Sequence, residues 1–308
     1  MRRVCAILWV LAVIVQFPVQ AQRSSDWRTF RVADGLAESF VTSVSVSQRS
    51  NIWVKHFETS SVSVLDGYSV KIIPAPTRGA YRIHESRSGQ IWAAHSEGIQ
   101  EFRNGTWVQY PIPEVRREFQ TNVLRNARSI PMVPLKQGRV LFLLSDRLME
   151  FNNDWTPQFE YKTLLHTSQT KLARFSDLAL GRDGTLWLLG NDGLLRLTSG
   201  IRITADSLWE EFPVPDDMAE DLRHAQPDDE GGLTAVGLTS ETGDRVIAHF
   251  DGASWAAVLA PSSQVRQAWR APGGGFWALS ATALYRLDED GAWRVDTDVP
   301  ASQFFDVA

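Results

Sequence analysis

The stretch Asp183-Gly184-Thr185-Leu186-Trp187, followed by Gly193-Leu194, decides the fold because its pattern recurs along the chain. The pattern is a turn residue, a spacer, an apolar residue and then tryptophan. Its copies, two of them degenerate, end at Trp53, Trp92, Leu141, Trp187, Thr234 and Trp277. Successive copies lie 39, 49, 46, 47 and 43 residues apart. Such a period indicates a repeat protein whose units bury their apolar faces only against one another.

A second tryptophan position follows five of the copies, after a small-plus-apolar step and a polar turn, and Trp27, ahead of the first copy, is counted with it. Its occupants are Trp27, Trp107, Trp155, Trp209, Trp255 and Trp293. Only Trp9 and Trp269, of twelve tryptophans, lie outside the two positions. Alternating segments such as 41–46, separated by Gly, Asp and Asn pairs, predict four short strands in each unit, and no stretch carries a helical period. The sequence therefore predicts an all-β protein, a β-propeller of four-stranded blades.

The predicted blades lie near residues 40–73, 80–112, 128–160, 174–212, 222–259 and 265–297. The longest connections between them are 113–127 and 161–173, where we expect the ligand-facing rim. Residues 27–30 occupy the position of a blade's outermost strand, and 303–308 that of the innermost strand of a new blade. We thus expect six full blades plus a partial seventh, with the chain truncated within it and the missing strands in a longer parent protein.

The N-terminus has the pattern of an export signal. Arg2 and Arg3 precede an apolar run over 4–15, and Val19-Gln20-Ala21 provides small residues at the cleavage positions. The pattern predicts a signal peptide over 1–21 and a propeller domain over 22–308, in a periplasmic or secreted protein. An uncleaved anchor is the alternative, although the run is short for a membrane span.

Composition and motif searches exclude several classes of function. Cys5, the single cysteine, lies in the signal peptide, so the mature chain has no disulfide and no thiolate ligand. Loss of Arg2 and Arg3 leaves 31 − 2 = 29 basic residues against 36 acidic ones, a charge of −7, which disfavours nucleic acid as a partner. Catalytic, phosphate-binding and metal-ligand motifs are absent. We expect no catalytic residue, no metal and no cofactor.

The repeat resembles that of the two-component regulator propeller family. The similarity lies in Trp27-Arg28-Thr29-Phe30, Asp34-Gly35-Leu36, and Asp183–Trp187 with Gly193-Leu194, and it extends over the mature chain. In that family the propellers are periplasmic sensor parts of hybrid histidine kinases and related transducers, often responding to polysaccharide fragments. The resemblance implies a sensor that passes its signal to a kinase or other output domain beyond residue 308, in a parent protein that can dimerise.

Two groups of residues are candidates for ligand binding. His56 and His95 each follow a repeat tryptophan by three residues, so equivalent strand ends in neighbouring blades could place them side by side. A polar residue replacing threonine at a strand end is the simpler alternative. The second group is a series of arginines at the start of successive innermost strands: Arg82, Arg128, Arg174, Arg223 and Arg266.

These arginines would converge at one mouth of the central channel, where guanidinium groups suit carboxylate or sulfate. Tyr81 and Trp269 lie on the same inner strands, and flat aromatic rings suit sugars. Local pairing with acids such as Asp177 or Asp221 is the alternative.

The sequence leaves three functions open. The first is a sensor that binds an extracellular or periplasmic ligand, possibly an anionic glycan. The others are a secreted polysaccharide lyase or hydrolase using His56 and His95, and an envelope protein-interaction scaffold. An enzyme would gather ionisable groups in one pocket, whereas a scaffold would expose a broad apolar patch.

Overall fold

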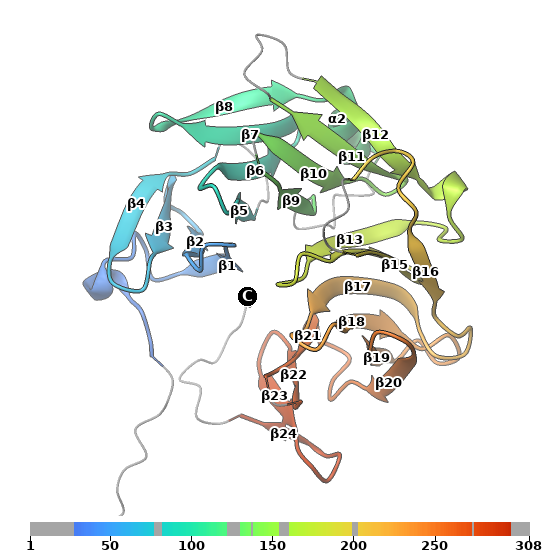
Figure 1. Ribbon diagram of the computed structural model, residues 1–308. Helices are drawn as coiled ribbons and strands as arrows, with labels where there is room; N and C mark the ends of the chain where they lie inside the picture. Colours follow the sequence, from blue (N-terminus) through green and yellow to red (C-terminus); the bar gives the residue numbers. More distant parts are fainter. Residues whose placement is uncertain are drawn as a thin grey trace, which may run out of the picture.

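A computed structural model describes residues 28–76, 82–121, 130–136, 138–153, 160–198, 203–272 and 274–296. In this part of the chain the strands form six four-stranded antiparallel sheets, and in every sheet the strands follow one another in chain order. Figure 1 shows the sheets arranged as blades around a common centre, each with its first strand innermost. The predicted all-β propeller is therefore confirmed for six blades.

The strands of the first two blades are β1 (Val41–Val46), β2 (Ile52–His56), β3 (Ser61–Leu65), β4 (Val70–Pro74), β5 (Ile83–Glu85), β6 (Ile91–His95), β7 (Gly98–Arg103) and β8 (Thr106–Pro111). Those of the third and fourth are β9 (Met132–Pro134), β10 (Arg139–Leu143), β11 (Arg147–Asn152), β12 (Glu160–His166), β13 (Phe175–Leu180), β14 (Leu186–Gly190), β15 (Gly193–Leu197) and β16 (Glu210–Pro213). Those of the fifth and sixth are β17 (Glu220–Pro227), β18 (Leu233–Leu238), β19 (Arg245–Phe250), β20 (Trp255–Leu259), β21 (Gln267–Arg270), β22 (Phe276–Leu279), β23 (Leu284–Leu287) and β24 (Trp293–Val295).

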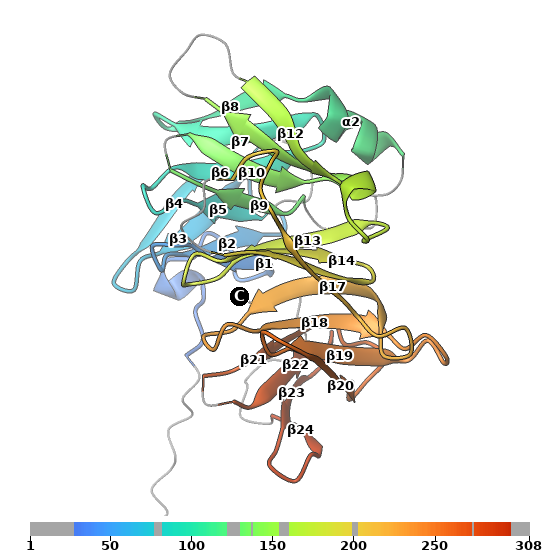
Figure 2. The ribbon, with the colours of Figure 1, turned by 45° about the vertical axis from the view of Figure 1, so that its right-hand side comes forward.

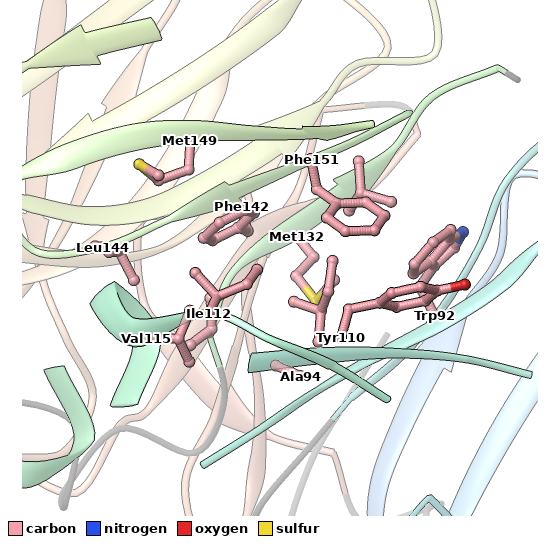
Figure 3. Packing of buried hydrophobic residues seen from close by; sticks show 13 residues of the cluster. Trp92, Ala94, Tyr110, Ile112, Val115, Met132, Phe142, Leu144, Met149 and Phe151 are labelled. Atoms are coloured by element: carbon pink, nitrogen blue, oxygen red, sulfur yellow. The ribbon is translucent and has the colours of Figure 1, made fainter. Parts of the chain in front are cut away.

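The first tryptophan position of the repeat packs one blade against the next. Trp53, Trp92 and Trp187 are each at most 3% exposed. Trp92 meets Phe151 of the third blade edge-on, with ring centroids 5.6 Å apart, in the cluster drawn in Figure 3. A large ring buried at these three blade boundaries explains why tryptophan is favoured there, because each ring removes much apolar surface from water.

The second tryptophan position joins the outer strands of neighbouring blades. The indole N–H of Trp107 donates to the carbonyl of Pro74, at the end of the preceding blade, over 2.9 Å. Trp293 donates in the same way to Leu259 over 3.0 Å, and Trp255 to Phe212 over 3.4 Å. The position thus selects an aromatic residue that can also donate a hydrogen bond.

A buried carboxylate joins the first and second blades near the channel. Glu85, at the end of β5, is 4% exposed and accepts hydrogen bonds from three side chains of the first blade. The donors are Asn51 Nδ2 (2.8 Å), Trp53 Nε1 (3.1 Å) and Arg49 Nη1 (3.2 Å). Buried polar groups need such partners, so this cluster fixes the position of one blade relative to the other.

The predicted connection 113–127 does lie between β8 and β9, but its expected structure and the predicted connection 161–173 both need correction. Residues 113–120 form a helix, α2 (Pro113–Gln120), where no helical period was expected. Only Val115 of this helix is buried, so the apolar residues are too few to form a helical period that the sequence could reveal. The predicted connection 161–173 is largely strand β12, followed by the single turn η2 (Thr167–Gln169).

The first and sixth blades each have a local feature of their own. A short turn, η1 (Val32–Asp34), leads to Leu36, which is 5% exposed and packs on the first blade, and Ala37 N donates to Ser63 Oγ over 3.0 Å. Trp277 of the sixth blade is only partly buried and lies parallel to Trp269, with centroids 6.3 Å apart.

The partial seventh blade is not among these sheets. Residues 28–30 form no strand, while Trp27 and residues 303–308 lie outside the described residues, as does the predicted signal peptide. The helices of the described segments include none that is long and apolar enough to cross a membrane.

Candidate functional site

The channel between the innermost strands forms a cavity in the described part of the molecule. Its volume is about 790 Å³, and residues of β1, β5, β9, β13, β17 and β21 line it. Because the first strands of all blades run in the same direction along the channel, their first residues meet at one mouth. Glu118 of α2 lines the same mouth and accepts a hydrogen bond from Ser145 N over 3.1 Å.

Four of the five predicted arginines lie on the channel wall. Arg82, Arg174 and Arg266 each immediately precede an innermost strand, namely β5, β13 and β21. Arg223 lies inside β17 and also lines the channel. Arg128 and Tyr81 fall outside the described residues. The structure adds Arg245, at the start of β19, which the search of innermost strands missed because it belongs to a third strand.

The arginines differ in their pairing. Arg223 Nη2 lies 2.8 Å from Asp221 Oδ2, two residues away, as the alternative of local pairing predicted. Within the described segments the guanidinium groups of Arg174, Arg245 and Arg266 have no ion pair or hydrogen bond. Three uncompensated cations from three blades therefore line one cavity, and such a site attracts anions.

Asp177, on β13, is an acid of the channel wall. Its Oδ1 accepts from Leu178 N and its Oδ2 from Ala225 N of the fifth blade, both over 2.8 Å. Burial raises the pKa of Asp177, whereas the two amides and the charge of Arg82 act in the opposite direction. Both oxygens of Asp177 thus accept from backbone amides, and the charge of Arg82 also acts on this carboxyl group.

The innermost strand of the fifth blade is irregular where it lines the channel. Asp221 and His224 of β17 have positive φ angles of 51° and 60°, and the pairing of β17 with β18 is interrupted twice. A side chain other than glycine pays about 1–3 kcal/mol for such a backbone conformation, which tends to persist at functional sites. Both residues are in the channel wall.

A histidine that the repeat did not indicate also lines the channel. His84 lies in β5, two residues after Arg82, and its Nε2 is buried without a hydrogen-bond partner in the described structure. Burial lowers the pKa of His84 to about 3, and the nearby charge of Arg82 adds to the effect. The imidazole is therefore neutral at physiological pH.

The other predicted residues lie away from the channel. His56 and His95 end β2 and β6, are 2% and 3% exposed, and are absent from the channel wall. His56 Nε2 lies 2.8 Å from Ser63 Oγ, and His95 Nδ1 accepts from Glu97 N, so each has a local role at its strand end. Trp269 packs on Trp277 instead of lining the channel. The described residues contain no cluster of three groups that could hold a metal.

Comparisons with known proteins extend the fold assignment. No protein-family model and no curated protein matches the chain. Virginiamycin B lyase from Staphylococcus aureus is 15% identical, with a TM-score of 0.57 over 83% of this chain and 84% of that chain. The extracellular domain of the putative hybrid two component system BT3049 from B. thetaiotaomicron is 13% identical, with a TM-score of 0.57 over 87% and 36%. PorZ, a surface component of the type-IX secretion system of Porphyromonas gingivalis, is 12% identical, with a TM-score of 0.56 over 88% and 42%. At these identities the similarity shows the propeller fold alone.

Proposed function

We propose that this protein is an extracytoplasmic ligand-binding propeller, the sensor part of a membrane signal transducer of the histidine-kinase type. Its ligand is an anionic oligosaccharide that binds at the arginine-lined mouth of the channel. The observation that carries this proposal is the convergence of Arg82, Arg174, Arg223, Arg245 and Arg266 on one cavity.

The chemistry of the wall supports an anionic ligand. The whole chain has a net charge of −5, whereas the described channel wall carries five arginines and four acids, namely Glu85, Glu118, Asp177 and Asp221. Arginine binds carboxylate and sulfate through two parallel hydrogen bonds, and its charge counts for more in a cavity than in open water. A volume of about 790 Å³ also lies within the usual range of small-molecule sites, roughly 300–1,000 Å³.

The sensor role rests on the export pattern of residues 1–21 and on the fold. One structural neighbour is the extracellular domain of a putative hybrid two component system, and another is a bacterial surface component. Fold likeness is an analogy and not a demonstration of function. The signalling output would lie in other domains of the parent protein, through which the sensor could dimerise.

The enzyme alternative receives less support from the structure. Virginiamycin B lyase has the same fold, so propellers of this kind can host an active site. The predicted catalytic pair, however, was His56 and His95, and both are packed at strand ends away from the channel. We therefore favour binding over catalysis.

Calorimetry with anionic oligosaccharides tests the proposal. We expect the mature protein to bind a tetrasaccharide of galacturonate or a sulfated counterpart, and the double variant Arg174→Ala/Arg266→Ala to bind it at least tenfold more weakly, since each lost charge-assisted hydrogen bond costs about 1.5–3 kcal/mol. The matched control is Arg87→Ala/Arg182→Ala, which removes the same charge from exposed turns after β5 and β13, at the opposite mouth. Equal affinity of all three proteins would refute the site.

A further inference from the structure

The irregular course of β17 determines which of its side chains reach the channel. Between Arg223 and Gln226 the chain advances three residues, whereas its partner β18 advances two, from Val236 to Thr234. The extra residue is a β-bulge. As a result Leu222 and Ala225, three residues apart, are both buried in the same hydrophobic cluster, which a regular strand with its period of two would not allow.

Polar residues of this irregular segment line the channel. Arg223 and His224 are part of the wall, together with Asp221 and Gln226. His224 lies within the bulged stretch and has a positive φ angle. The backbone course of β17 therefore determines where these side chains lie on the wall.

One bond from another blade holds this conformation. Asp177 Oδ2 accepts from the amide of Ala225, the residue after His224, over 2.8 Å. Its other oxygen is anchored to Leu178 N, so the carboxylate is fixed at both ends. The bond connects β13 to β17, which belong to different sheets but lie side by side in Figures 1 and 2.

We propose that Asp177 is a positioning residue of the channel site: by fixing the amide of Ala225 it holds Arg223 and His224 on the wall, where they contact the anionic ligand. The inference rests on the proposed function, because it assigns two of the ligand's contacts. Its chemistry is that of a side-chain oxygen acceptor that stabilises a backbone conformation unfavourable for residues other than glycine. The backbone of β17 in the fifth blade is then held in place by Asp177 of the fourth blade.

A double-mutant cycle tests the assignment, with the galacturonate tetrasaccharide as the probe in calorimetry. Asp177→Ala and Arg223→Ala should each weaken binding about tenfold, and the double variant should be no weaker than either single one, since both act through the same contact. Asp177→Asn keeps one acceptor oxygen and should restore part of the affinity. The control is Asp183→Ala, whose carboxylate accepts from Thr185 N at the turn between β13 and β14, and which should bind as the unchanged protein does.

Hydrogen exchange of the ligand-free protein gives a readout that does not depend on the probe. In Asp177→Asn the amides of 220–226 should exchange faster, while those of β14 and β15 keep their rates. Unchanged exchange in β17, or additive losses of about a hundredfold in the double variant, would overturn the inference.

The outcomes separate the two proposals. If Arg174→Ala/Arg266→Ala weakens binding but Asp177→Ala and Arg223→Ala do not, the positioning role is wrong and the proposed function stands. If the unchanged protein binds no anionic probe, the proposed function itself fails.

Discussion

Replacing Glu85 by alanine removes the acceptor that joins the first two blades. Three donors of the first blade converge on this carboxylate, and the two shorter bonds come from Asn51 Nδ2 and from the indole of Trp53. Trp53 is 3% exposed, so in the variant its N–H stays buried without a partner. The change therefore tests whether a polar cluster, and not apolar packing alone, sets the position of neighbouring blades.

The contacts give the magnitude. A hydrogen bond to a charged group contributes about 1.5–3 kcal/mol, and an orphaned buried donor costs about 1–3 kcal/mol. The Arg49 pair adds about 0–1 kcal/mol, because the arginine side chain is 53% exposed. Removing a buried charge relieves some desolvation, which offsets part of these losses. We expect Glu85→Ala to lower the free energy of unfolding by about 2–4 kcal/mol, and Glu85→Gln, which keeps an acceptor, by about 1 kcal/mol.

Urea unfolding followed by tryptophan fluorescence and circular dichroism measures these changes. The control is Glu210→Ala, which breaks the surface pair with Arg196 and should cost less than about 1 kcal/mol. If Glu85→Ala unfolds within about 0.5 kcal/mol of the unchanged protein, the cluster does not stabilise the blade boundary and the reasoning is wrong.

Two further predictions concern stability. The pKa of His84 is about 3 in the folded protein and about 6.5 in the unfolded chain, so the folded state favours the neutral imidazole. The contribution of His84 to the free energy of unfolding is therefore fully present above pH 6.5. It falls by about 1.4 kcal/mol per pH unit as the pH drops from 6.5 toward 3. Between pH 7 and pH 5 the free energy of unfolding of His84→Leu, measured by urea titration, should therefore fall by about 2 kcal/mol less than that of the unchanged protein. If the free energies of unfolding of the two proteins change in parallel with pH, the prediction is wrong. Trp187→Ala should cost about 3–5 kcal/mol, since Trp187 is 2% exposed between two blades. Trp277→Ala should cost clearly less stability, because the same repeat position is only partly buried in the sixth blade. Thermal unfolding measures both changes. If the two variants lower the midpoint temperature equally, Trp277 is covered as fully as Trp187 and the prediction is wrong.

The blades could be predicted from the sequence because each tryptophan position has one repeated physical role. Trp187 is buried between blades, and Trp107 donates to the preceding outer strand. The prediction is less accurate in the third blade, whose copy has Leu141 in place of tryptophan and whose outer strand β12 lies later than expected. The helix α2 was missed because a single buried valine gives no period.

The site could be predicted only in part. Residues that precede an innermost strand, such as Arg174 and Arg266, reach the channel by repeat position alone. His56 and His95 occupy equivalent positions, but strand ends also pack against local partners, and repeat spacing does not say which way a side chain points. The bond from Asp177 to Ala225 joins two blades through a bulge, and bulges follow from tertiary packing that no repeat period encodes.

Because every strand pairs only with its neighbours in the chain, the order of assembly is set by synthesis. Each sheet closes through short connections, so the entropy lost in forming it is small and hairpins can form within microseconds. The slower step is the docking of one finished sheet on the next. Until the fifth blade is complete, the ring of Trp187 has no Phe250 to pack against and faces water. The nascent protein is then most vulnerable to aggregation at its growing end, and folding should proceed from the first blade toward the last.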